Sequence, residues 1–169
     1  ERILVVEWDE LADWLIRNRF HLSAKAVVVS RAGYPAPIFA ACQGFLARHP
    51  ATPVQVLHDA SLSGFALSAQ LAADPQWRFA RDRLVDLGLS RPALDGKIRL
   101  PWLPRSTAAN GALSSDHDAM LRDGRRVPVD CIPPKPLLSL LATAVVAGTL
   151  VLPLPKAGET DFEVEADYG

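Results

Sequence analysis

The sequence predicts an α/β fold with a mostly parallel β-sheet flanked by helices and an irregular C-terminal extension. Short apolar runs rich in valine and leucine alternate with longer segments whose apolar residues recur at helical spacing. Strands buried on both faces are continuous apolar runs, and short connections between alternating strands and helices are typical of parallel sheets. These two observations favour helices packed on both faces of one sheet.

The expected elements fill the first ninety residues. Apolar runs bounded by turn residues predict four strands, at residues 2–6, 26–30, 54–57 and 84–87. Apolar residues at helical spacing predict three helices, at residues 8–19, 38–48 and 65–73. Polar turns are expected at 30–35 and 58–64, at the carboxyl ends of the second and third strands. We expect residues 1–90 to form the α/β domain.

The pattern changes from about residue 91, and we expect residues 91–169 to form a loop-rich extension. Residues 91–126 are rich in proline and glycine and show no sustained periodicity. Residues 136–155 carry no charge and are nominally long enough to cross a bilayer, but prolines interrupt them and no aromatic belt flanks them. We therefore expect a buried helix and short strand within 137–152, with Gly148 as the helix C-cap. The tail from residue 158 is acidic.

The composition of the 169-residue chain limits the classes of function. Apolar residues make up 49% and charged residues 22%, which excludes wholesale disorder. The net charge of -1 argues against a highly basic nucleic-acid coat and leaves room for a local basic patch. Two cysteines, Cys42 and Cys131, are too few for a disulfide scaffold, so we expect a cytoplasmic protein. The apolar strand directly after Glu1 suggests a domain boundary, so other domains or subunits, and a homo-oligomer, are candidate partners.

Two carboxylates follow predicted strands. Glu7 comes directly after the first strand and Asp59 comes just after the third. The carboxyl ends of parallel strands share one edge of a sheet, where ligands commonly bind. Carboxylate oxygens are the ligands that Mg²⁺ prefers, and a bound metal can assist phosphate chemistry. Strand-end carboxylates also occur as helix caps, so this pattern alone favours a metal site only weakly.

A resemblance to the Toprim domain adds to this pattern. It rests on residues 3–7 (Ile-Leu-Val-Val-Glu), 27–30 with 33–35 (Gly-Tyr-Pro), and 54–59 with Gly64. The chain is most similar to the branch with the A subunit of topoisomerase VI, the meiotic double-strand-break transesterases and the Wadjet-type plasmid-defence nucleases. The positions that match this branch are Glu7, Gly33, Pro35, Asp59 and Gly64. The resemblance covers about residues 2–90.

The resemblance implies a Rossmann-like, Toprim-type domain that acts on DNA. In such a domain Glu7 and Asp59 would be catalytic and would hold Mg²⁺ or Mn²⁺ at the scissile phosphate, with Gly33, Pro35 and Gly64 shaping the turns. The enzyme would be a metal-dependent nuclease or a topoisomerase-like subunit within a larger assembly. Neither tyrosine lies in the motif that the topoisomerase relatives use to cut DNA.

Ser61 departs from the family pattern, because relatives have a second aspartate there. As a third metal ligand, a neutral hydroxyl binds Mg²⁺ more weakly than a carboxylate does. His58 would suit a transition metal better than Mg²⁺. The alternative is therefore a degenerate, metal-free Toprim fold that serves as a protein-interaction or scaffolding module.

Other candidate residues also have two interpretations. Glu7 could pair with a surface Arg or Lys, and Asp59 could cap the helix that follows it. The four tryptophans are expected to pack in the core or at an interface. Arginines that could contact DNA phosphates, or else lie on a solvated face, are Arg31, Arg122, Arg125 and Arg126.

Overall fold

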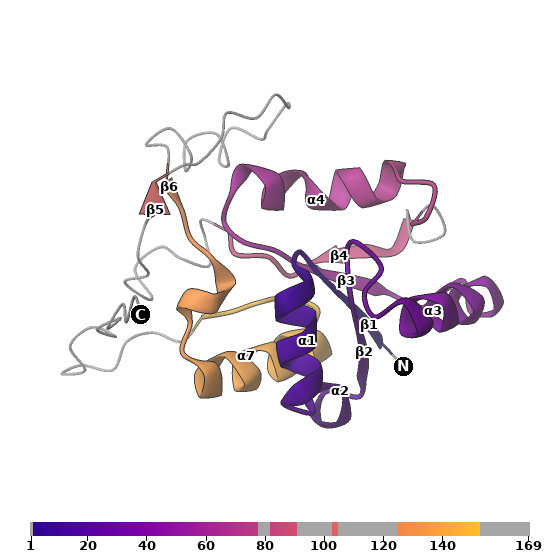
Figure 1. The fold of residues 1–169 in the computed structure, drawn as a ribbon, viewed down its shortest axis with the longest axis horizontal. Helices are drawn as coiled ribbons and strands as arrows, with labels where there is room; N and C mark the ends of the chain where they lie inside the picture. The colour runs from indigo at the N-terminus through magenta and orange to yellow at the C-terminus, as the bar shows by residue number, and fades with distance from the viewer. Residues whose placement is uncertain (1, 78–81, 91–102, 105–124, 153–169) are drawn as a thin grey trace.

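The computed structural model describes residues 2–77, 82–90, 103–104 and 125–152 (Figure 1). Within these residues the core is a four-stranded, all-parallel sheet with the strand order β2-β1-β3-β4. The strands are β1 (Arg2–Val6), β2 (Ala26–Ser30), β3 (Val54–Leu57) and β4 (Leu84–Asp86). The predicted α/β class is confirmed, and all four predicted strands are present.

The strand register brings the candidate residues to one edge of the sheet. Val6, the last residue of β1, lies opposite Ser30 in β2 and Leu57 in β3. The residues that follow these strands therefore leave the sheet at the same level. This places Glu7 and the segment that begins at His58 side by side at the carboxyl edge.

Helices cover both faces of the sheet (Figure 1). One face is covered by α1 (Asp9–Arg17), α2 (Phe20–Ser23) and α7 (Pro134–Ala147), and the other by α3 (Ala36–Arg48) and α4 (Leu62–Ala73). Successive side chains of a strand point to opposite faces, so Leu4 packs with the first group and Val5 with the second. Because both faces are covered, the four buried positions of β1, residues 3–6, are all apolar, as the sequence pattern indicated.

Besides α3, which starts at Ala36 instead of residue 38, two predicted helices have different bounds in the structure. The helix expected at 8–19 ends at Arg17, and α2 begins beyond it at Phe20, because Arg19 adopts a left-handed backbone conformation with φ of 56°. The third helix, α4, starts at Leu62 instead of residue 65, since the side chain of Ser61 caps it. The predicted turn at 58–64 is therefore shorter than expected. Both differences come from local backbone choices that apolar periodicity does not report.

The helix α7 completes the core although it lies far from the strands in sequence. Leu141 is fully buried in the same cluster as Leu4. Nε2 of Gln55, in the middle of β3, donates a 2.7 Å hydrogen bond to the carbonyl of Val145. The helix ends at Gly148, with φ of 73°, so the predicted C-cap is confirmed.

The strand expected at 149–152 is wrong. These residues are irregular, and among the described residues no strand lies beside them. Leu150 and Leu152 are nonetheless buried against the core, which explains the apolar pattern without a strand. Across the described ranges, no helix is both long and apolar enough to cross a bilayer.

Little of the predicted loop-rich insertion is described. It contributes a short antiparallel pair, β5 (Leu103–Pro104) with β6 (Arg125–Arg126), and a bridge between Ala60 and Val127. The single-turn helix η2 (Val129–Cys131) follows before α7. Arg122, Trp102 and the acidic tail lie outside the described residues. The segment 125–133 nevertheless returns to the carboxyl edge of the sheet, beside Asp59.

Candidate functional site

The structure brings the two predicted carboxylates together at the carboxyl edge. Glu7 follows β1 and is 2% exposed, and Asp59 follows β3 and is 5% exposed. The backbone N–H of Asp59 donates a 3.2 Å hydrogen bond to Oε2 of Glu7. The first carboxylate therefore holds the backbone of the loop that carries the second.

Every carboxylate oxygen of this pair accepts a hydrogen bond from the protein. Oε1 of Glu7 accepts from the Ser63 hydroxyl at 2.8 Å, and Oε2 accepts from the Asp59 N–H. Oδ1 of Asp59 accepts from the N–H of Val129 at 2.8 Å, and Oδ2 accepts from the indole N–H of Trp8 at 3.3 Å. The pair thus joins the ends of two strands, the start of α4 and the segment before α7.

Burial raises the pKa of the Asp59 carboxyl, and the nearby charge of Glu7 adds to the rise. The hydrogen bonds from Val129 and Trp8 act in the opposite direction, because they stabilise the ionised form. Protonating one of two adjacent buried carboxyls relieves their repulsion, so Asp59 holds its proton more tightly than an exposed aspartate does.

Ser61 is the N-cap of α4 in the structure. Its hydroxyl oxygen accepts a 3.0 Å hydrogen bond from the N–H of Gly64 and lies 3.1 Å from the hydroxyl of Ser63. The alternative in which Asp59 caps this helix is wrong, since its carboxylate bonds to Trp8 and Val129. Serine is a preferred N-cap residue, which gives Ser61 a structural reason to stand at this position.

Gly64 is required by close packing and not by an unusual dihedral angle. A Cβ atom there would collide with the backbone carbonyl of Asp59 and approach Nδ1 of His58 to 2.8 Å. The loop folds back onto the first turn of α4, and only a residue without a side chain leaves room for it. The glycine at this position of the Toprim-like pattern therefore has a steric explanation.

His58 is a buried histidine clamped between two acceptors. Its Nδ1 lies 2.7 Å from the carbonyl oxygen of Asp59, and its Nε2 lies 3.0 Å from the carboxylate of Asp86 at the end of β4. The carbonyl of Asp59 can only accept, so Nδ1 is the protonated nitrogen. An ionised Asp86 is matched best by a second proton on Nε2, so this arrangement favours the imidazolium form of His58. Burial opposes this charge, but the hydrogen bond and charge of Asp86, with smaller contributions from Asp59 and Glu7, raise the pKa of His58. His58 thus acts as a donor to its neighbours and not as a metal ligand.

The turn after β2 completes this edge of the sheet. The N–H of Ser30 bonds to the carbonyl of Tyr34 at 2.7 Å, and Gly33 has φ of 85°, a conformation that favours glycine. Pro35, which follows a cis peptide bond, caps α3. Gly33 and Pro35 therefore form a turn, with no part in the carboxylate pair.

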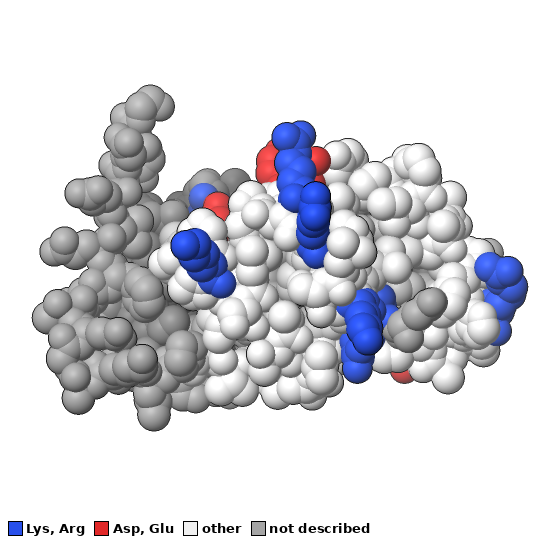
Figure 2. All heavy atoms as spheres, turned by 90° about the horizontal axis from the view of Figure 1, so that it is seen from below, with Lys and Arg blue, Asp and Glu red and all other residues white. Residues whose placement is uncertain are grey.

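The predicted DNA-contacting arginines do not form one group in the described residues. The guanidinium of Arg31 lies 5.7 Å from the ring centroid of Trp8, and Arg126 lines a cavity beside Asp59. Arg122 and the side chain of Arg125 lie outside the described residues. Figure 2 shows the face that carries α1, α2 and α7, where basic side chains stand in small separate groups and acidic side chains lie beside some of them.

The described residues contain no group of three or more His, Cys, Asp or Glu side chains that could hold a metal ion. Glu7 and Asp59 are the two of the predicted ligands that lie together, and Ser61 turns its oxygen toward the helix backbone. The two free cysteines do not supply a nucleophile, because burial raises the pKa of Cys42 and of Cys131 to about 11.

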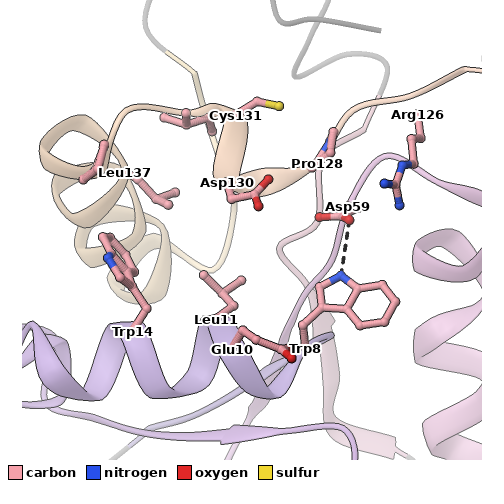
Figure 3. A pocket seen from close by; sticks show the side chains of 12 residues that line it. Trp8, Glu10, Leu11, Trp14, Asp59, Arg126, Pro128, Asp130, Cys131 and Leu137 are labelled. Carbon is pink, nitrogen blue, oxygen red and sulfur yellow. Dashed lines mark hydrogen bonds between the residues drawn. The ribbon is translucent and has the colours of Figure 1, made fainter. Parts of the chain in front are cut away.

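A cavity of about 660 Å³ opens beside this cluster, between α1 and the segment from β6 to the start of α7 (Figure 3). Asp59 forms one part of its wall, and Trp8, which is 41% exposed, stands next to it. The residues that line the cavity are Trp8, Glu10, Leu11, Trp14, Asp59, Arg126, Pro128, Asp130, Cys131, Ile132, Pro134 and Leu137. It occupies the carboxyl edge of the sheet, where ligands of parallel α/β folds bind.

Sequence reasoning missed several residues of this site. Trp8 was expected to pack in the core or at an interface, yet it is exposed and donates to Asp59, whereas Trp77 is fully buried. Val129 and Asp130 come from a stretch without periodicity and reach Asp59 only through the tertiary fold. Asp86 offered a signal that could have been used, because it is a third carboxylate at the end of a predicted strand.

Comparison with family models, curated proteins and solved structures gives no match for this chain.

Proposed function

We propose that this chain is a binding module built on a Toprim-like α/β core, in which Glu7 and Asp59 are structural residues and not metal ligands. The observation that carries the proposal is the use of all four carboxylate oxygens as acceptors for the protein's own donors. A metal at this position would compete with donors such as the Val129 N–H for the lone pairs of these oxygens, and any donor that it displaced would be left buried without an acceptor. An unsatisfied buried group costs about 1–3 kcal/mol, so each displaced bond opposes metal binding.

Ser61 supports the same conclusion. Its oxygen is already engaged by the first turn of α4, so it does not extend the carboxylate pair toward a third ligand. The cavity beside the pair offers a surface for binding, and the hydrogen bonds of the two carboxylates fix the segments that form its wall. The proposed activity is therefore recognition of a ligand or partner at the carboxyl edge.

The proposal is tested by calorimetric titration of the full chain with Mn²⁺ and Mg²⁺. We expect no saturable binding at millimolar metal. Ser61→Asp is the informative variant, because aspartate is also a good N-cap and should keep its oxygen on the Gly64 N–H. We therefore expect Ser61→Asp to bind no more metal than the parent. Saturable Mn²⁺ binding by the parent that disappears in Asp59→Asn would overturn the proposal.

A second candidate is metal-assisted cleavage of DNA within a larger nuclease or topoisomerase-like assembly. The observation in its favour is the direct contact between the two predicted ligands, with the Asp59 N–H 3.2 Å from Oε2 of Glu7. In this case the ion would stabilise negative charge that develops on the scissile phosphate. The same titration separates the two candidates, because this one predicts metal binding that Ser61→Asp strengthens.

A further inference from the structure

The cavity beside Asp59 has an apolar end and a charged end. The apolar end is built from α1 and the start of α7, where Leu11, Trp14 and Leu137 line it. The charged part carries Asp59 and Asp130, which comes from η2. At about 660 Å³ the cavity falls within the range of roughly 300–1,000 Å³ that is usual for small-molecule sites.

The side chains follow one another along the cavity in a definite order. In Figure 3, Trp14 and Leu137 lie at one end, the carboxylates of Asp130 and Asp59 lie in the middle, and Arg126 lies at the far end. A ligand that matches this order has an apolar body, then a cationic group, then an anionic group or strong acceptor.

The charged groups of the cavity differ in what they lack. Arg126 lines the cavity, and its buried Nε finds no hydrogen-bond acceptor among the described residues, so its guanidinium group is a donor still open to a ligand. Asp130 is exposed at the cavity wall and offers its carboxylate to a cation. A purely anionic ligand would face the carboxylates of Glu10, Asp59 and Asp130, and a purely cationic one would leave the arginine donor unpaired. Only a ligand with both charges satisfies both groups.

We propose that this cavity binds a small zwitterion with an apolar body, namely an α-amino acid with an apolar or aromatic side chain. The ammonium group faces Asp130, the carboxylate receives the hydrogen bond of Arg126, and the side chain lies between Trp14 and Leu137. This inference rests on the proposed function as a binding module and names its ligand class. Trp14 adds a flat apolar surface on which an aromatic side chain can pack.

The test is calorimetric titration of the full chain with L-phenylalanine and L-leucine. Two analogues serve as matched ligands, since 2-phenylethylamine lacks the carboxylate and 3-phenylpropionate lacks the ammonium. We expect saturable binding of the amino acids and about tenfold weaker binding of each analogue, because each loses one charge-assisted hydrogen bond. An equal affinity for phenylalanine and either analogue would overturn the zwitterion assignment.

Variants locate the site. Asp130→Asn and Arg126→Gln should each weaken amino-acid binding about tenfold. Asp82→Asn is the matched control, because Asp82 is an exposed carboxylate just before β4, at the opposite edge of the sheet, and it should bind like the parent. Asp130 is also exposed, so its variant is expected to fold, and circular dichroism checks this for every variant.

The outcomes separate this inference from the proposed function. If neither amino acid binds at millimolar concentration, or if Asp130→Asn binds as well as the parent, the ligand assignment is wrong. A chain that binds neither amino acids nor metal would overturn this inference alone. Saturable Mn²⁺ binding that depends on Asp59 would instead overturn the proposed function.

Discussion

The clamp on His58 predicts that replacing Asp86 changes the pH dependence of stability. In Asp86→Asn, the amide oxygen can keep the 2.7 Å hydrogen bond from the Gly88 N–H, while the amide N–H₂ turns toward Nε2 of His58. Nε2 then becomes the acceptor, and Nδ1 still donates to the carbonyl of Asp59. The variant thus suits a neutral His58, whereas the parent suits the imidazolium.

The sign of the effect follows from the raised pKa of His58 in the folded parent. A raised folded pKa means that protonation stabilises the fold, and this contribution is complete below the unfolded pKa, near 6.5. It is lost as the pH rises through the folded pKa. A hydrogen bond to a charged group contributes about 1.5–3 kcal/mol when buried, but the Asp86 side chain is 53% exposed. We therefore expect a difference of about 1 kcal/mol between parent and variant at low pH.

Urea denaturation followed by tryptophan fluorescence, at intervals from pH 5.5 to 9, measures this difference. We expect Asp86→Asn to be less stable than the parent near pH 5.5 and almost equal to it near pH 9. Asp82 is an exposed carboxylate two residues before the strand that ends at Asp86. The free energy of unfolding of Asp82→Asn should therefore change with pH in the same way as that of the parent. A parent and an Asp86→Asn variant separated by the same free energy at every pH would refute the imidazolium assignment. An NMR titration in which the pKa of His58 is the same in both proteins would refute it as well.

Substitutions at four further positions test the structural contacts by urea denaturation. Ser61→Ala should lower the free energy of unfolding by about 1 kcal/mol, since α4 loses its N-cap, and Ser61→Asp should not. Gly88→Ala should destabilise by about 1–3 kcal/mol because its Cβ would collide with the ring of His58. Gly44 lies in α3, and a Cβ atom there would have nothing within 4 Å, so Gly44→Ala should instead stabilise the fold by about 0.5–1 kcal/mol. Equal effects of the two glycine variants would contradict the close packing of Gly88 against His58. Leu141→Ala should cost about 2–5 kcal/mol, and a loss below 1 kcal/mol would show that α7 does not complete the core.

Much of the fold could be predicted because the local signals agree with the tertiary structure. The run at residues 3–6 is apolar throughout since β1 lies in the middle of the sheet with helices on both faces. The same reasoning failed at 149–152, where buried leucines pack against the core from an irregular backbone. Apolar side chains report burial, and they report a strand only when a neighbouring strand is available for pairing.

The candidate site was predictable in its position but not in its chemistry. Parallel strands place the residues after β1 and β3 at one edge, so the position of Glu7 and Asp59 at that edge followed from the parallel sheet that the pattern predicts, and the neighbouring order of β1 and β3 brings them into contact. What the carboxylates do there depends on donors that the pattern does not reveal. The N–H that bonds to Asp59 belongs to Val129, 70 residues later, in a stretch without periodicity.

The difference between a metal ligand and a structural carboxylate is therefore decided by tertiary contacts and not by residue type. An aspartate after a buried strand has the same side chain whether its oxygens face open solvent or the N–H groups of Val129 and Trp8. Ser61 gives the one local signal of the second case, since a serine in place of an aspartate keeps the N-cap while it removes a charge from a buried cluster. With Ser61 bonded to the Gly64 N–H and the Asp59 carboxylate bonded to Trp8 and Val129, these side chains hold the loop after β3 against the start of α4 and the segment before α7.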